Sequence, residues 1–251
     1  MEKTKIDWCE STWNPITGCL HGCEYCYART IAHRFDGKVE PDIKESDLRV
    51  LDEPLAGDKG RLAYPFGFNP TFHKYRLNDY ESKQGRNIFV CSMADLFGAW
   101  VPTEWIEEIF EVCKKAPQHN YLFLTKNPER YITLENEKKL PWVNNCWFGT
   151  SVTKLSDKYT WFTEKKFHWF ISVEPILEDL GEMNPNSAKP EWVIVGAETG
   201  NRKNKVVPKR EWIEKLVAEC KKYNIPIFMK SSLAEIWGED LIQQYPEQLK
   251  H

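Results

Sequence analysis

The chain has 251 residues, a formal net charge of −3 at pH 7 and 28% charged residues. This balance excludes a surface that is basic throughout, although a local basic patch for nucleic acid is compatible with it. No run approaches the roughly 20 apolar residues that span a bilayer, and no apolar segment follows the N-terminal lysines as in a secretory signal. We therefore predict a cytoplasmic protein without a membrane partner, in which thiols stay reduced.

The first predicted strand runs through STWNPITG (11–18) and ends at Gly18. Directly after it, GCLHGCEYCY (18–27) brings Cys19, Cys23 and Cys26 into eight positions. In a reducing compartment such a cluster indicates metal binding or catalysis rather than disulfides. The other cysteines lie far apart, and we expect them to be small buried hydrophobic side chains; they are Cys9, Cys91, Cys113, Cys146 and Cys220.

An amphipathic helix, ARTIAHRF (28–35), is predicted after the cysteines, with Arg29 as a surface cation. Residues 36–86 then interrupt the pattern, because they are rich in charge, Pro, Gly and Tyr. An insertion of this length in a compact domain is usually functional or disordered. Its many aromatic residues argue against disorder, so we predict a lid or side wall over the mouth of the sheet.

The rest of the chain alternates between strands and helices. Near-continuous apolar runs at 87–93, 120–125, 146–152, 168–175, 191–197 and 225–230 are typical of parallel strands that are covered on both faces. Helices are predicted at 102–116, 127–134 and 208–224, where acidic starts, apolar periodicity or basic ends occur. This alternation predicts a parallel α/β sheet or barrel forming a single domain over residues 1–251, with 36–86 inserted after the first helix.

Ligands of parallel α/β folds bind at the carboxyl ends of the strands. Two carboxylates, Asp95 and Glu174, follow apolar strands there, and a carboxylate in such a place is costly unless it has a partner or a role. We also expect the cysteine cluster at this edge, because it follows the first strand. A helix cap or a loop hydrogen bond is the alternative role for each polar residue at this edge.

Thiolates are soft ligands that suit iron–sulfur clusters, zinc and copper(I). A cluster of four irons takes four thiolates, so Cys19, Cys23 and Cys26 would leave one iron free for another ligand. The alternative is a non-catalytic zinc module, in which His21 or His33 completes a tetrahedral site that stabilises the fold or binds nucleic acid. Against zinc, His21 lies inside the tight loop, where we expect its ring to point outward.

The spacing CLHGCEYC resembles the signature of the radical S-adenosylmethionine (SAM) superfamily, with Tyr25 at the aromatic position. The resemblance implies a partial (β/α)6 TIM-like barrel and a [4Fe–4S] cluster held by Cys19, Cys23 and Cys26. It also implies SAM as cosubstrate, a 5′-deoxyadenosyl radical that abstracts hydrogen from the substrate, and a flavodoxin- or ferredoxin-type electron donor.

A narrower resemblance covers nearly the whole chain. The blocks TWNPITGC, CSMADLFG, LTKNPERY, GTSV, SVEP and WVIVGAETG are similar to those of a small phage-associated radical SAM-like family. One assigned relative there is queuine lyase, which cleaves a carbon–nitrogen bond of queuine and releases 7-aminomethyl-7-deazaguanine in queuosine salvage. The resemblance therefore implies a lyase that acts on a small heterocyclic base. The Gly-Gly-Glu of the wider superfamily is absent, and SMAD stands in its place.

The resemblance also suggests which residues bind each ligand. SAM would contact Tyr25, Ser92, Asp95, Thr150, Ser151, Glu174 and Gly196. The base would contact Trp13, Asp95, Lys126, Glu174 and Glu198, with a carboxylate accepting its ring N–H and exocyclic amine. An alternative substrate is a nucleobase within DNA or RNA, because NRKNKVVPKR (201–210) carries five cations and no acid, and these cations could track phosphates. A solvated loop is the other interpretation of that run.

Overall fold

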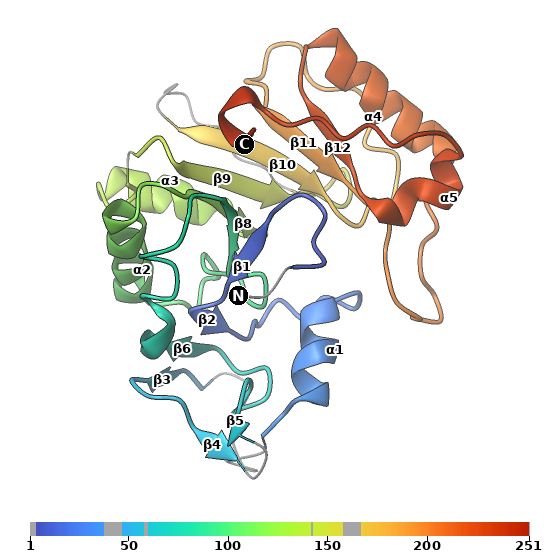
Figure 1. The fold of residues 1–251 in the computed structure, drawn as a ribbon. Coiled ribbons are helices and arrows are strands. Elements are labelled where there is room, and N and C mark those ends of the chain that lie inside the picture. Colours follow the sequence, from blue (N-terminus) through green and yellow to red (C-terminus); the bar gives the residue numbers. More distant parts are fainter. Residues whose placement is uncertain (1–3, 38–46, 58–59, 142, 158–166, 251) are drawn as a thin grey trace.

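A computed structural model describes residues 4–37, 47–57, 60–141, 143–157 and 167–250. Its main sheet consists of seven parallel strands that curl into a half barrel (Figure 1). Their order is β1 (Ser11–Trp13), β7 (Asn87–Val90), β8 (Asn120–Thr125), β9 (Cys146–Ser151), β10 (His168–Val173), β11 (Trp192–Val195) and β12 (Ile227–Met229). The predicted α/β partial barrel is confirmed, with one strand more than a six-unit barrel has.

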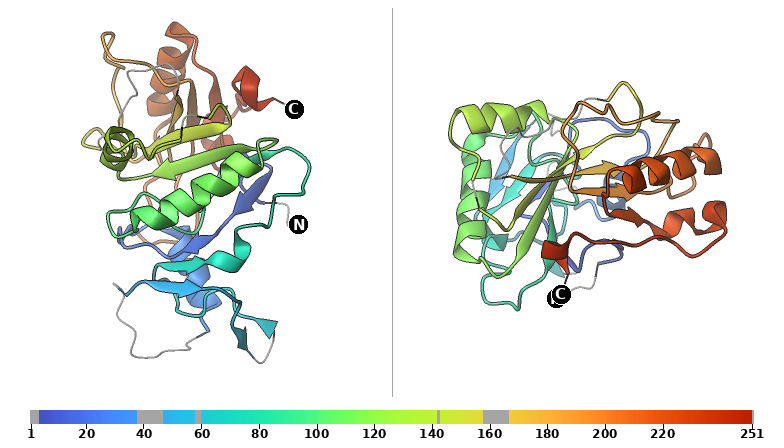
Figure 2. Two further views of the ribbon diagram at one scale, coloured as in Figure 1. Left: turned by 90° about the vertical axis from the view of Figure 1, so that its left-hand side faces the viewer. Right: turned by 90° about the horizontal axis from the view of Figure 1, so that it is seen from above.

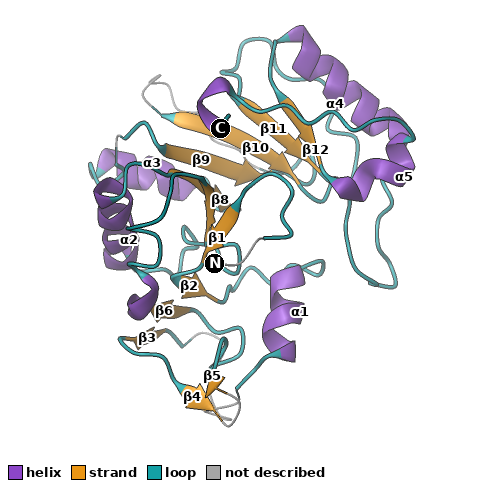
Figure 3. Cartoon of the chain, viewed as in Figure 1, coloured by secondary structure: helices purple, strands orange, loops and turns teal. Residues whose placement is uncertain are grey.

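Helices cover one face of this sheet (Figures 1 and 3). The helices α2 (Thr103–Lys115) and α3 (Glu129–Asn136) follow β7 and β8, and α4 (Arg210–Lys222) follows β11, close to the predicted ranges. The inward side of α2 includes the fully buried Ile106 and Ile109, which pack in one core cluster with Phe123 of β8. The remaining helical segments are α1 (Tyr27–Arg34), α5 (Ala234–Trp237) and the 3-10 turns at Lys74–Arg76, Ser231–Leu233 and Glu247–Leu249.

The opposite face, which we call the inner face, is closed at the amino ends of the strands by an aromatic cluster. Trp147, Phe170 and Trp192 come from adjacent strands, and Trp8 of the N-terminal segment packs on Phe170 and Trp192. These four side chains are at most 1% exposed, and burying each contributes about 2–3 kcal/mol of transfer free energy. Because side chains alternate along a strand, the next inward positions lie above this floor, towards the carboxyl ends.

The predicted first strand is broken in the middle. β1 ends at Trp13, and β2 (Ile16–Thr17) leaves for a second sheet after the Asn14–Pro15 pair. Proline has no backbone N–H for a ladder, and the carbonyl of Pro15 accepts a hydrogen bond from the N–H of His73 at 2.7 Å. The prediction of one strand over 11–18 was therefore wrong, although the cysteines still follow this region.

The insertion after α1 forms two small sheets, one of them shared with β2, at the end of the molecule opposite α4 (Figure 2). β6 (Thr71–His73) pairs antiparallel with β2 and parallel with β3 (Arg49–Leu51), and β4 (Ala56–Gly57) pairs with β5 (Gly60–Arg61). Phe66, Phe68 and Phe72 are buried, as expected of an ordered segment. Residues 38–46 and 58–59 of the predicted lid lie outside the described residues.

Two further expectations concern the whole chain. None of the described helices has the length and apolar composition needed to cross a bilayer. The five dispersed cysteines are all buried, as predicted.

Candidate functional site

The three clustered cysteines lie on one loop, residues 18–26, between β2 and α1; we call it the cysteine loop. Gly18 begins it at φ +88°, a conformation that glycine adopts without strain, and its N–H donates to the carbonyl of Met93 at 2.9 Å. The N–H of Cys19 donates to the carbonyl of Phe68 at 3.3 Å, so the insertion borders the loop. Cys26 caps α1, and its Sγ accepts from the N–H of Arg29 at 3.4 Å. A helix N-terminus favours a negatively charged group.

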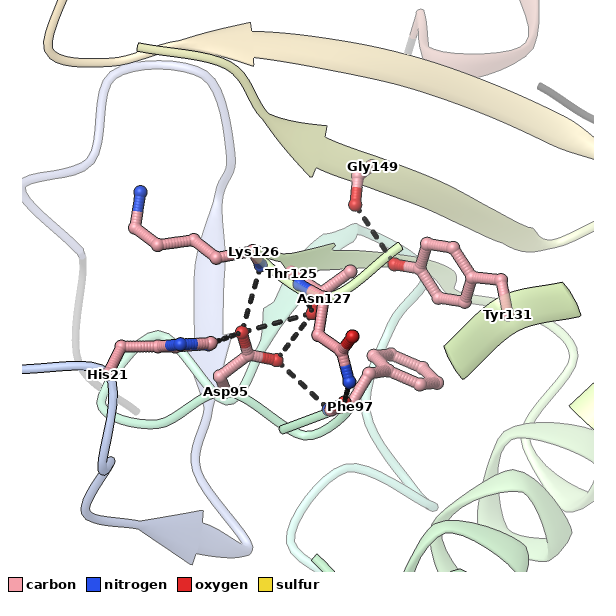
Figure 4. A network of polar contacts seen from close by, with 8 residues as sticks. All are labelled: His21, Asp95, Phe97, Thr125, Lys126, Asn127, Tyr131 and Gly149. Carbon is pink, nitrogen blue, oxygen red and sulfur yellow. Dashed lines mark hydrogen bonds and ion pairs between the residues drawn. The ribbon is translucent and has the colours of Figure 1, made fainter. Parts of the chain in front are cut away.

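Asp95 joins this loop to the strand ends (Figure 4). Its Oδ2 lies 2.7 Å from Nε2 of His21 and accepts from the backbone N–H of Lys126 at 2.9 Å. Its Oδ1 accepts from the backbone N–H of Phe97 at 3.0 Å and from the Thr125 hydroxyl at 2.8 Å. The buried carboxylate is therefore fully engaged with protein donors, which stabilises the charge without any ligand.

Arg202 makes a second connection between the cysteine loop and the sheet. Its Nε and one terminal nitrogen donate to the two carboxylate oxygens of Glu198 at 2.7 and 2.8 Å, and its other terminal nitrogen lies 3.2 Å from the carboxylate of Glu24. Glu198 follows β11 and its side chain is only 2% exposed. The hydrogen bonds from Arg202 hold the pKa of the Glu198 carboxyl below its usual value. A buried carboxylate thus anchors an arginine that reaches the cysteine loop.

Lys126, at the end of β8, supplies a cation beside the loop. Its ammonium lies 5.3 Å from the ring centroid of Tyr25. Burial raises the pKa of the Cys23 thiol, and the positive charge of Lys126 opposes that rise. Burial also raises the pKa of Cys19 to about 12, and the nearby Asp95, Cys23 and Cys26 add to it. Bound metal would replace these protons, since thiolates and not thiols are metal ligands.

The residues of the cysteine loop fit a soft metal centre in donor chemistry, with three half-buried thiols that interact electrostatically and a cation beside them. Among the described residues, no group of three His, Cys, Asp or Glu side chains is arranged to hold a metal ion. The metal-binding role of Cys19, Cys23 and Cys26 stays a prediction.

Two levels of polar residues line the inner face above the aromatic floor. The sheet register sets Ser151 of β9 opposite Ser172 of β10, and the alternation of side chains points both inward. Lys126 directly follows Thr125, the last residue of β8, which pairs with Thr150. One level higher stand Glu174, Gly196 and Lys230, which directly follow the paired residues Val173, Val195 and Met229 of three adjacent strands. The Lys230 ammonium forms an ion pair with Oε1 of Glu174.

Some predicted site residues lie elsewhere. Trp13 is 2% exposed in the core, and its indole N–H donates to the carbonyl of Arg76 at 2.8 Å, so it offers no free face for a base. Thr150 has the same strand parity as Phe148, which packs with the helices, so its side chain leaves the inner face. His21 points towards the sheet and not outward, because Asp95 binds it.

Other predicted residues connect elements around the loop. The hydroxyl of Tyr27 donates to the carbonyl of Ser92 at 2.7 Å, and the Ser92 hydroxyl donates to Oδ1 of Asn14 at 3.1 Å. Arg29 is not a solvated cation, because it donates to the carbonyl of Cys19 at 3.3 Å and lies over the ring of Phe68. The ligand-binding roles predicted for Ser92, Ser151 and Gly196 stay predictions.

Sequence reasoning missed His21 as a partner of Asp95, Arg202 as a partner of Glu198, and Lys230 as a partner of Glu174. Only Lys230 carried a local signal, since it ends an apolar strand just as Glu174 does. The contact of His21 with Asp95 joins residues far apart in the chain, and the contact of Arg202 with Glu198 depends on a loop conformation that no sequence pattern indicates.

The fold and loop define a half-barrel protein with three thiols at the carboxyl edge of its sheet. The chain belongs to the family described as "Protein of unknown function (DUF5131)", whose profile matches residues 3–246. No curated protein matches it in sequence.

Two solved structures are similar to it. A point mutant of spore photoproduct lyase shares 9% identity at a TM-score of 0.50, covering 91% of this chain and 78% of its own. Spore photoproduct lyase complexed with dinucleoside spore photoproduct has 11% identity and a TM-score of 0.48, covering 94% of this chain and 76% of its own. The first similarity shows that the fold is shared.

Proposed function

We propose that the protein is a radical SAM enzyme that acts on a nucleobase. The observation that carries the proposal is the position of the cysteine loop: its residues His21 and Tyr25 contact Asp95 and Lys126 after β7 and β8, at the carboxyl edge of a partial barrel. In parallel barrels that edge is where catalysis takes place. The shared fold with spore photoproduct lyase, a radical SAM enzyme, supports the class.

Cys19, Cys23 and Cys26 would hold a [4Fe–4S] cluster with one iron left for SAM. When bound, the cluster and SAM would supply one-electron cleavage of a carbon–sulfur bond and a 5′-deoxyadenosyl radical. The chain's own contribution is positioning. Asp95 and Arg202 fix the two sides of the loop, Lys126 places a positive charge beside Cys23, and the aromatic floor keeps water from the far end of the inner face.

For the substrate, we propose a small 7-deazapurine, with cleavage of queuine to 7-aminomethyl-7-deazaguanine as the specific reaction. The motif blocks of the sequence support this choice, as do the inward-facing polar residues above the floor. A flavodoxin- or ferredoxin-type protein would deliver the electron, and the cytoplasm is the compartment that keeps the thiols reduced.

A second candidate is a nucleobase within nucleic acid. The observation in its favour is the loop after Glu198, where Lys203, Lys205 and Lys209 are exposed and Arg202 connects to the cysteine loop. Binding of an oligonucleotide that weakens as salt rises would favour this candidate. No binding at low salt would remove it.

The test of the class is anaerobic purification followed by metal and sulfide analysis. We expect about four irons per chain with matching sulfide, and 5′-deoxyadenosine on reduction with SAM. Cys19→Ala, Cys23→Ala and Cys26→Ala should each abolish that product. One zinc per chain without sulfide would instead identify the zinc module. In the structure, Nε2 of His21, a candidate zinc ligand, is bonded to Asp95. Incubation with queuine and mass analysis of the bases then tests the substrate.

A further inference from the structure

Glu174 and Lys230 form an ion pair that spans an intervening strand. Val173, Val195 and Met229 are in register on β10, β11 and β12, so Glu174, Gly196 and Lys230 follow at one level. A Cβ on Gly196 would lie 3.0 Å from Cδ of Lys230 and 3.4 Å from its Cβ. Lys230 therefore lies across the glycine to reach Glu174, and a larger residue at 196 would require the lysine side chain to shift.

Among the three carboxylates considered for ligand binding, Glu174 keeps the most free acceptor capacity and is partly exposed. Asp95 accepts from two backbone N–H groups, a hydroxyl and an imidazole. Glu198 accepts from Nε and one terminal nitrogen of Arg202 and from the backbone N–H of Val206, and its side chain is only 2% exposed. Within the described chain, the hydrogen bond that Glu174 accepts is the one from Lys230, whereas an ionised carboxylate has about four acceptor positions. Its side chain is 27% exposed, against 14% for Lys230.

The inward position below Glu174 on the same strand is also polar. Ser172, two residues before Glu174 on the same side of β10, is fully buried, and in the part of the chain that the structure describes its hydroxyl has no partner.

We propose that the Glu174–Lys230 pair recognises the donor–donor–acceptor edge of a guanine-type base. This inference rests on the proposed function and names the substrate class for the same site. The two carboxylate oxygens of Glu174 would accept from the ring N1–H and the exocyclic 2-amino group. The Lys230 ammonium would donate to the O6 carbonyl.

The chemistry of the pair favours this edge over others. Guanine and 7-deazaguanine present two adjacent donors followed by an acceptor, which matches a carboxylate followed by an ammonium. The adenine edge presents its exocyclic amine where guanine has O6, so that amine would face the ammonium. In the free protein each charged group neutralises the other, and the base would replace that contact with charge-assisted hydrogen bonds. A site of this kind rejects analogues that leave its charged groups unpaired.

Direct binding of three bases to the full-length protein, purified anaerobically, tests the proposal. The probes are 7-deazaguanine, 7-deazahypoxanthine, which lacks the 2-amino donor, and 7-deazaadenine. We expect the wild type to bind 7-deazaguanine at least about 100-fold more tightly than 7-deazaadenine, with 7-deazahypoxanthine between them. Equal affinity for the three bases would overturn the proposal.

Variants of the pair separate recognition from folding. Glu174→Gln and Lys230→Met should each weaken 7-deazaguanine binding about 10- to 100-fold and change 7-deazaadenine binding far less. The double variant Glu174→Lys/Lys230→Glu keeps a pair of opposite charges but reverses the array, so guanine preference should stay lost. Lys215→Met, at the exposed pair of Lys215 with Asp179, is the matched control and should bind as the wild type does.

Two outcomes distinguish this inference from the proposed function. Iron content and 5′-deoxyadenosine formation with SAM alone report the enzyme class and do not require the base. If iron content and 5′-deoxyadenosine formation are as expected but the protein does not prefer 7-deazaguanine, only the inference fails. If Glu174→Gln weakens SAM binding and leaves base binding unchanged, the pair belongs to the cosubstrate and the inference is equally overturned.

Discussion

Nε2 of His21 lies 2.7 Å from Oδ2 of Asp95, and this contact joins the cysteine loop to the ends of β7 and β8. The same carboxylate holds the backbone N–H groups of Phe97 and Lys126. Asp95 therefore holds two strand-end turns as well as the loop. Replacing Asp95 removes all of these contacts, whereas replacing His21 removes only the contact with the loop.

We predict that Asp95→Asn destabilises the fold by about 2–4 kcal/mol, because the amide turns N–H donors towards N–H donors in a buried place. His21→Ala should cost about 1 kcal/mol or less and should chiefly release the loop. Urea unfolding measures the first effect, and the rate of Cys19 alkylation, followed by mass spectrometry, measures the second. Equal stability of Asp95→Asn and wild type would contradict the role given to Asp95.

Replacing Arg202 tests its contact with the buried Glu198. In Arg202→Gln the buried Glu198 loses its cation, so its pKa should rise and acid unfolding should begin at higher pH. The sign follows from the lowered pKa of Glu198 in the wild type: its stabilisation is present above the unfolded pKa and is lost as pH falls through the folded value.

Glu24→Gln provides the matched control for Arg202, because Glu24 is 82% exposed. An exposed ion pair contributes little, so this variant should unfold in acid as the wild type does. Circular dichroism against pH compares the three proteins. Acid profiles that coincide for Arg202→Gln and wild type would refute the anchoring role.

The two glycines of the cysteine loop should differ in their tolerance of a side chain. A Cβ at Gly18 would lie 2.2 Å from the carbonyl oxygen of Asn69, whereas a Cβ at Gly22 would meet nothing within 4 Å. Both have positive φ. Gly22→Ala should therefore cost about 1 kcal/mol through backbone strain alone, and Gly18→Ala about 3 kcal/mol or more. Urea unfolding of both variants checks the difference, and equal costs would show that the insertion yields at this contact.

His73 makes the contact between the insertion and β2 sensitive to acid. It is fully buried between Thr17 and Tyr75, and burial, assisted by Arg76 and Arg61, lowers its pKa to about 3. As the pH falls, the unfolded chain therefore protonates His73 before the folded protein does. The free energy of unfolding is not reduced by His73 above pH 6.5, and it falls as the pH drops from 6.5 towards 3.

At pH 5 this effect amounts to about 2 kcal/mol. Urea unfolding at pH 7.5 and 5.0 should show that His73→Asn loses less stability on acidification than the wild type. His33→Asn, at an exposed position, should behave as the wild type. A His73→Asn variant with undiminished acid sensitivity would place the titration elsewhere.

The sheet and its helices could be predicted because their signals are local. Continuous apolar runs such as 120–125 became β8 with identical bounds, and the basic end of 102–116 became the last turn of α2. The break at Asn14–Pro15 was missed, since the pairing of β2 with β6 joins residues far apart in the chain.

The site was only partly predictable for the same reason. The spacing of Cys19, Cys23 and Cys26 is a local signal, but His21 and Asp95 are 74 residues apart, and Glu24 and Arg202 are 178 apart. On sequence alone, Asp95 was as good a candidate for ligand binding as Glu174, and Glu198 was a further candidate for the base. Only the hydrogen bonds and the burial of each side chain distinguish the carboxylates that the protein engages from Glu174.

The contact between Glu24 and Arg202 has a consequence for how the protein is made. The thiols belong to roughly the first tenth of the chain, whereas Arg202 follows Glu24 by 178 residues. During translation the cysteine loop therefore lacks this neighbour until most of the polypeptide has been made.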